Sequence, residues 1–232
     1  MHWLVIVLAL SLAACTTKMG KDGRTQTTVD VKYLAKSDVD RIADTDRAEV
    51  VEGLLLIADK LYKRNPKEWK KGGAVSREAA VERLRQRNSR SWPEFGGLRE
   101  RQAAALAFSN TYDGDRVAAL VYGLLTMVDA AFEHKEEFYI LDSLNETKLY
   151  NAARNMEIAV WKLSTDRDAA GDLFLLSNEL DPANRNVSFE REFGRITGLL
   201  DFMAKIVADR NGRTVSRAAQ SVTTMIFLPV SF

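Results

Sequence analysis

The sequence predicts an all-α fold, a single helical bundle or orthogonal array of about seven helices. Apolar residues recur three or four positions apart through several long segments, which is the period of a helix with one buried face. Most of these segments follow a capping residue and end at Gly, Asn or Pro. β-branched residues alternate only weakly, over 27–33, so no strand ladder is expected. A short α-solenoid is the alternative, although no tetratricopeptide pattern of Trp, Leu, Gly and Tyr is present.

The first predicted helix covers 37–64. Ser37 with Asp40 resembles a capping box, and Pro66 disfavours helical backbone at the residue before it. The apolar positions between them have helical spacing: Val39, Ile42, Val50, Leu54, Ile57 and Leu61. The stretch 66–73 ends in two glycines and is expected to be a turn.

Three helices are predicted in the middle of the chain. The first, 76–86, is amphipathic and begins at a cap, Ser76, and a loop separates it from an Ala-rich helix at 98–109. The third, 115–134, is apolar nearly all round, which indicates burial from several sides. We therefore expect 115–134 to lie at the centre of the core.

The last part of the chain is predicted to hold four helices: 145–163, 168–180, 188–210 and 214–227. Asn145 and Ser188 are the expected caps of the two longer ones. The helix at 168–180 is expected to be short and weak.

The chain begins with an uncharged apolar run, residues 3–14, that ends in Leu12, Ala13, Ala14 and Cys15. The run is too short to span a bilayer but has the length of a signal-peptide core. Its end resembles the lipobox of bacterial lipoproteins. The resemblance implies cleavage before Cys15, a thioether from its thiol to diacylglycerol, and an acyl chain such as palmitate on the new amino group.

The same resemblance implies a division of the chain and a location. Residues 1–14 would be the signal peptide, 15–36 the lipidated cysteine with a flexible tether, and 37–232 the helical domain. Two or more acyl chains anchor a protein stably to a membrane. Because residue 16 is Thr and not the Asp of the inner-membrane sorting rule, we expect the outer membrane, at its periplasmic face.

The amino-acid composition limits the partners, metals and cofactors that we expect. The formal net charge of +1 lacks the basic excess of nucleic-acid-binding domains, so no nucleic-acid partner is expected. Cys15 is the only cysteine, and lipid would consume its thiol. His134 would be the sole histidine after signal removal, while a His-based zinc site needs more than one. We expect no metal and no cofactor, and we interpret His134 as a residue near a helix C-terminus, which the helix dipole favours.

The candidate ligand-binding residues are Tyr150, Arg154, Glu157 and Trp161. They stand at i, i+4, i+7 and i+11 and therefore share one helix face, beside a stripe with Asn151 and Asn155. An Arg and a Glu between two aromatic rings could hold a polar ligand. Alternatively, Arg154 and Glu157 form an ordinary ion pair, and the rings pack against a neighbouring helix.

Three other features stand out, and two of them have two interpretations each. Asp129 in the apolar helix is either a perturbed functional carboxylate or the partner of an Arg. Gly194 and Gly198 would allow a close helix contact. The apolar segment 225–232 either closes the core or forms an exposed patch for a partner.

The functional hypotheses follow from this anchor and the lack of catalytic motifs. The leading one is a non-catalytic lipoprotein, an accessory or scaffold in envelope assembly or transport, with a protein partner in the envelope. The second is a periplasmic component that binds a small molecule between helices. The third is a carboxylate-based hydrolase of envelope glycans, which needs two acidic side chains across a groove.

Overall fold

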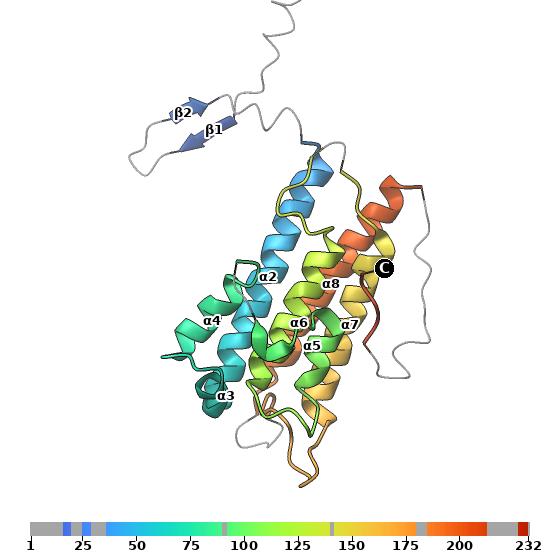
Figure 1. The fold of residues 1–232 in the computed structure, drawn as a ribbon. Coiled ribbons are helices and arrows are strands. Elements are labelled where there is room, and N and C mark those ends of the chain that lie inside the picture. The colour runs from blue at the N-terminus through green and yellow to red at the C-terminus, as the bar shows by residue number, and fades with distance from the viewer. Residues whose placement is uncertain are drawn as a thin grey trace, which may run out of the picture.

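The computed structural model describes residues 16–19, 25–28, 36–89, 92–139, 142–179, 185–212 and 227–231, and this part of the chain is an all-α bundle with seven α-helices (Figure 1). The helices are α2 (Asp38–Arg64), α3 (Pro66–Lys71), α4 (Arg77–Arg85), α5 (Glu100–Leu106), α6 (Arg116–Ala131), α7 (Glu146–Thr165) and α8 (Ser188–Arg210). A 3₁₀ turn, η3 (Pro93–Phe95), lies before α5. The predicted fold class is confirmed.

Helices α2, α6, α7 and α8 run side by side and form the body of the bundle (Figure 1). The first and last of them are antiparallel neighbours. Arg210 Nη1 at the end of α8 lies 3.1 Å from Asp40 Oδ1 at the start of α2, and Lys60 Nζ donates to the Ser188 carbonyl over 2.7 Å at their other ends. In a solenoid each unit contacts only its sequence neighbours, so this contact between the first and last helices excludes the solenoid alternative.

The centre of the core is α6, as its composition predicts. Every residue from Val117 to Ala131 is buried. The short α5 packs against α6 at Gly123, where an added Cβ would lie 2.4 Å from the Ala104 nitrogen. The backbones of the two helices can approach this closely because Gly123 has no side chain.

Three predicted caps, and one that was not predicted, are present as side-chain acceptors at helix starts. Ser37 and Asp40 form a reciprocal capping box at α2. Ser76 and Asn145 accept hydrogen bonds from the first-turn amides of α4 and α7, as predicted. Asp115 does the same for α6, although it was not predicted as a cap. These contacts depend only on residues within three positions of each other, which explains why the sequence predicts them well.

Two local predictions are wrong. The expected turn at 66–73 contains α3, because Pro66 is favourable in the first turn of a helix and Glu68 complements its dipole. The expected helix at 168–180 is absent from the described residues 168–179. There Asp168 Oδ1 accepts from the Ala170 and Asp172 amides at 2.9 and 3.0 Å, and this side-chain turn competes with helical hydrogen bonds.

Two predictions about α8 also need correction. Ser188 is its first helical residue and not its cap, and the Ser188 amide donates to Asn186 Oδ1 at 3.0 Å. Gly194 and Gly198 make no close helix contact. Both lie on the exposed face of α8, and an added Cβ would have no neighbour within 4 Å.

Two short antiparallel strands, β1 (Thr16–Met19) and β2 (Thr25–Thr28), pair in the predicted tether, where we expected no strand ladder. Their threonines favour extended backbone. The signal peptide, Cys15 and residues 213–226 of the predicted helix 214–227 lie outside the described residues. Of the C-terminal segment, 227–231 is described: Phe227 and Val230 are buried, so core closure is confirmed there.

Candidate functional site

One end of the bundle carries two adjoining hollows. Here the first turns of α2, the last turn of α8 and the connection from α6 to α7 meet. Ser143, Leu144 and Asn211 line both hollows. Because α2 begins at this end, it is also the end at which the chain from Cys15 joins the bundle (Figure 1).

The deeper hollow has a volume of about 320 Å³ and a wall of mixed apolar and polar residues. Its apolar residues come from all three elements: Val39, Ala43, Phe138, Leu144 and Val207. Its polar residues are Asp40, Asp142, Ser143, Arg210 and Asn211. Volumes of about 300–1,000 Å³ are typical of small-ligand sites.

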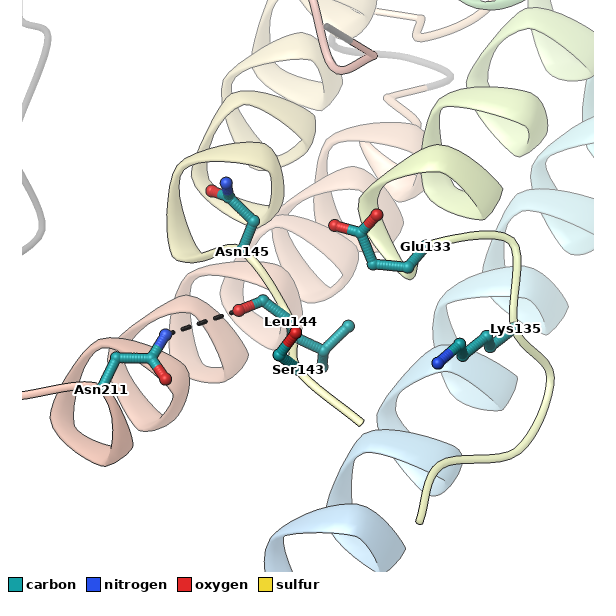
Figure 2. A pocket seen from close by; sticks show the side chains of 6 residues that line it. All are labelled: Glu133, Lys135, Ser143, Leu144, Asn145 and Asn211. Carbon is teal, nitrogen blue, oxygen red and sulfur yellow. Dashed lines mark hydrogen bonds between the residues drawn. The ribbon is translucent and has the colours of Figure 1, made fainter. Parts of the chain in front are cut away.

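The second hollow is wider and more polar, with a volume of about 640 Å³. Figure 2 shows its six lining side chains, which include Glu133 and Lys135 after α6 and Asn145 at the start of α7. Asn211 Nδ2 lies 3.4 Å from the Leu144 carbonyl and 3.1 Å from Glu146 Oε2. These contacts tie the end of α8 to the start of α7 across the hollow.

The charges around both hollows are paired. Asp40 contacts Arg210, Lys135 contacts Asp142, and Lys148 Nζ lies 3.0 Å from Glu133 Oε2. Burial raises the pKa of Asp40, but hydrogen bonds from Ser37 and the charge of Arg210 outweigh it and hold that pKa below its usual value. The hydrogen bond from Lys135 lowers the pKa of Asp142. Both carboxylates are therefore ionised at neutral pH.

The backbone beside the wider hollow is strained. Glu133 and His134 have φ values of 53° and 58°, in the left-handed region that few residues other than glycine adopt. The His134 amide donates to the Asp129 carbonyl at 2.7 Å and closes the end of α6. His134 thus lies just past a helix C-terminus, as predicted. Strained residues often cluster at functional sites, and this supports the choice of this end of the bundle as the candidate site.

The four candidate residues lie elsewhere, along one face of α7, and one of them, Arg154, contacts α8. Arg154 contacts Asp201 of α8 at 2.5 Å and Glu157 at 2.9 Å, and its guanidinium lies 4.9 Å from the centre of the Tyr150 ring. Trp161 is 39% exposed. Burial raises the pKa of Glu157. The ion pair of the alternative interpretation is present, and none of the four residues lines either hollow.

Asp129 is the partner of two arginines. Its carboxylate accepts from Arg87 Nε and Nη2 at 2.8 and 2.6 Å and from Arg47 Nη2 at 3.0 Å. All three side chains are buried. The cluster joins α6 to α2 and to the segment after α4, and it supports the interpretation of Asp129 as an ion-pair partner.

A second buried acidic cluster was not identified from the sequence. The Tyr62 hydroxyl donates to Asp115 Oδ2 at 2.8 Å, and burial raises the pKa of Asp115 to about 6. Both line a cavity of about 10 Å³ beside Arg83, which is about the size of one water molecule. Asp115 begins the predicted helix 115–134, but Tyr62 lies 53 positions away and no local pattern connects the two.

Comparison of the chain with protein-family models, with characterised proteins and with solved structures gave no match. Within the described residues, no group of three His, Cys, Asp or Glu side chains could hold a metal ion. None of the helices built from those residues is both long and apolar enough to cross a bilayer.

Proposed function

We propose that this protein is a lipoprotein anchored through Cys15 to the periplasmic face of the outer membrane, and that its helical domain is a non-catalytic accessory or scaffold in envelope assembly or transport. The proposal is supported by the position of the hollows close in sequence to the proposed anchor at Cys15. Val39, in the wall of the deeper hollow, follows Cys15 by 24 residues, which span at most about 80 Å when fully extended. The anchor therefore keeps this end of the bundle within reach of the bilayer.

The chemistry of the two hollows suits docking. An apolar patch surrounded by polar groups is the usual composition of a protein interface. Phe138 and Leu144 can contact an apolar side chain of a partner, and Ser143 and Asn145 are polar groups at the rim. Because the surrounding carboxylates are paired with Lys and Arg, a neutral polar partner segment is preferred over a strongly charged one.

The volume of the deeper hollow favours a second function, binding of a small amphipathic molecule. About 320 Å³ is enough for such a ligand, and a lining of both apolar and polar residues suits an amphipathic one. This function uses the same residues, so the tests below must distinguish a protein from a small ligand.

The first test concerns the anchor. Mass spectrometry of the protein from its native host should find a chain that begins at Cys15 and carries acyl chains, and fractionation should place it with the outer membrane. Cys15→Ser should prevent cleavage and lipidation. An unmodified Cys15, or the same fractionation for both proteins, would contradict the proposed anchor.

The second test concerns the end of the bundle. A photo-crosslinking amino acid is placed at Ser143, which is exposed at the rim of both hollows, and in a matched control at Lys67, which is exposed on α3 at the far end of α2 (Figure 1). The scaffold function predicts one defined protein adduct from position 143 and none from position 67. Equal adducts from both positions would contradict a partner site at this end. No adduct, together with thermal stabilisation by an envelope metabolite, would favour the small-ligand function.

A further inference from the structure

Residues 227–231 lie as an extended segment against α7, close to the start of α5 (Figure 1). Two of their side chains are anchors: Phe227 is 6% exposed and Val230 is fully buried. Residues 213–226 separate this segment from the end of α8. We call the surface that this segment covers, with Asn151, Asn155 and Glu100 as its hydrogen-bonding residues, the groove.

Two asparagines of α7 bind the backbone of the segment. Asn155 Oδ1 accepts from the Leu228 amide at 2.6 Å, and Asn155 Nδ2 donates to the Leu228 carbonyl at 2.9 Å. One helical turn earlier, Asn151 Nδ2 donates to the Pro229 carbonyl at 2.9 Å. A side-chain amide that satisfies both polar groups of one residue replaces the strand that an extended peptide would otherwise pair with.

Glu100 at the start of α5 binds the end of the segment. Its carboxylate accepts from the Ser231 hydroxyl at 2.6 Å and from the Ser231 amide at 3.3 Å. Glu100 has a φ of 48°, and its own amide donates to Thr126 Oγ1 of α6 at 2.7 Å. This unfavourable backbone conformation is thus held by α6 at the point where the carboxylate meets the segment.

The groove is polar where an ordinary core would be apolar. Asn155 is fully buried, and besides Leu228 its side chain contacts the Met127 sulfur at 3.0 Å. A buried amide without partners is costly, so Asn155 suits a position that a peptide backbone covers. The groove thus binds backbone groups and apolar side chains of the segment. Of the residues of the segment, Ser231 is the one whose side chain forms a hydrogen bond described above.

We propose that this groove is a binding site for an extended peptide of the pattern Phe-Leu-Pro-Val-Ser, and that it takes this segment from a second copy of the chain as well as from its own. Each copy carries both the groove and the segment, so a reciprocal exchange makes two identical sets of contacts and closes as a symmetric dimer. Residues 213–226 span up to about 45–50 Å when extended, while α7 with its 20 residues is about 30 Å long. The connection is long enough for the segment to reach a neighbouring bundle.

The groove is tested first with a free peptide. A protease site is placed within 213–226 of the full chain, the folded protein is cleaved, and exchange of the released segment for a fluorescent peptide of residues 225–232 is followed by anisotropy. We expect saturable binding that Asn155→Leu in the bundle weakens at least tenfold, whereas Gln102→Ala on the exposed face of α5 leaves it unchanged. A folded, cleaved bundle that takes up no peptide, or binds it equally well with Asn155→Leu, overturns the proposal.

The second copy is tested with a complementary pair of chains. One carries Asn155→Leu and keeps its segment, and the other keeps its groove and lacks residues 227–232. If the truncated chain does not fold alone, the cleaved protein takes its place. The mixture should form a one-to-one dimer by light scattering after chromatography, and neither chain should dimerise alone. Two monomers in the mixture at concentrations that saturate the free peptide would refute exchange between copies.

Discussion

Asp129 and Asp46 are both buried, and they differ in what surrounds the carboxylate. Asp129 accepts hydrogen bonds from Arg47 and Arg87, whereas Asp46 Oδ2 has no hydrogen-bond partner within the described residues. Burial raises the pKa of Asp46 to about 7. The two residues therefore affect stability in different ways, and each difference can be measured.

Asp129→Ala should destabilise the protein by about 3–5 kcal/mol, because it leaves two buried guanidinium groups without their carboxylate. Urea unfolding followed by circular dichroism measures the change. The control is Asp38→Ala, which removes the exposed pair with Arg41 and should cost less than about 1 kcal/mol. A loss for Asp129→Ala as small as that of the control would mean that the cluster does not hold α2 to α6.

Asp46→Asn should increase stability at alkaline pH. Because the pKa of Asp46 is raised from 3.8 to about 7, the folded state keeps a proton that the unfolded state has lost. The stability of the wild-type protein is therefore complete below about pH 4 and falls as pH rises to about 7, by an amount on the order of 3–4 kcal/mol from this residue.

Burial also raises the pKa of Asp115, to about 6, and this too lowers stability as pH rises. The contribution of Asp46 is therefore measured as the difference in unfolding free energy between Asp46→Asn and the wild type, in which the effect of Asp115 cancels. The free energy of unfolding of Asp46→Asn minus that of the wild type should grow from pH 5 to pH 8. A difference that stays constant over this range would show that Asp46 ionises normally in the folded protein.

Gly123 and Gly198 are both helical glycines, but their contacts with neighbouring helices differ. At Gly123 an added Cβ would lie 2.4 Å from the Ala104 nitrogen and 2.6 Å from the Glu100 carbonyl oxygen. At Gly198 it would meet nothing within 4 Å. Of these two glycines, only Gly123 lies where two helices approach closely. The close contact predicted from Gly194 and Gly198 is not at Gly198.

Gly123→Ala should therefore destabilise the protein by about 1–3 kcal/mol, because α5 and α6 must move apart. Gly198→Ala should stabilise it by about 0.5–1 kcal/mol, since alanine favours an exposed helix and loses less backbone entropy on folding. Thermal and urea unfolding of both variants give the two signs. The same sign for both would contradict the packing of α5 on α6.

The bundle as a whole should fold without the segment before α2. Ser37 and Asp40 cap α2 from within, and Asp44 accepts from Lys36 Nζ at 2.5 Å and from the Phe138 amide at 2.8 Å. A chain of residues 36–232 should keep its helical circular dichroism and unfold within about 0.5 kcal/mol of the chain that begins at Cys15, the difference usual for changes away from packed contacts. A larger loss would mean that 16–35 contribute to the fold.

Much of the helical architecture is predictable because its signals are local. Ser37, Ser76 and Asn145 mark helix starts through contacts with their own first turns. The apolar composition of α6 correctly places it at the centre of the core. The local errors, at 66–73 and 168–180, arise where a proline can either stop or start a helix and where an aspartate side chain competes for backbone amides.

The candidate site was much less predictable. The face shared by Tyr150, Arg154, Glu157 and Trp161 is real, but α8 provides Asp201 as a partner for Arg154, and no periodicity within α7 reveals this. The hollows at the end of the bundle combine the start of α2, the connection after α6 and the end of α8. Of their residues, Asp40 and Asn145 were named only as parts of helix caps, and Val39 only as an apolar position of a helix.

The sequence by itself determined most of the helices, three of their caps, the buried helix at the centre and the lipobox-like start of the chain. Only the tertiary structure decided that Asp129 meets Arg47 and Arg87, that α8 returns along α2 to form the hollows, and that 227–231 lies on Asn151 and Asn155. The first group depends on hydrogen bonds and burial within a few turns of one helix. The second depends on side chains between 42 and 170 positions apart, and packing alone brings them together.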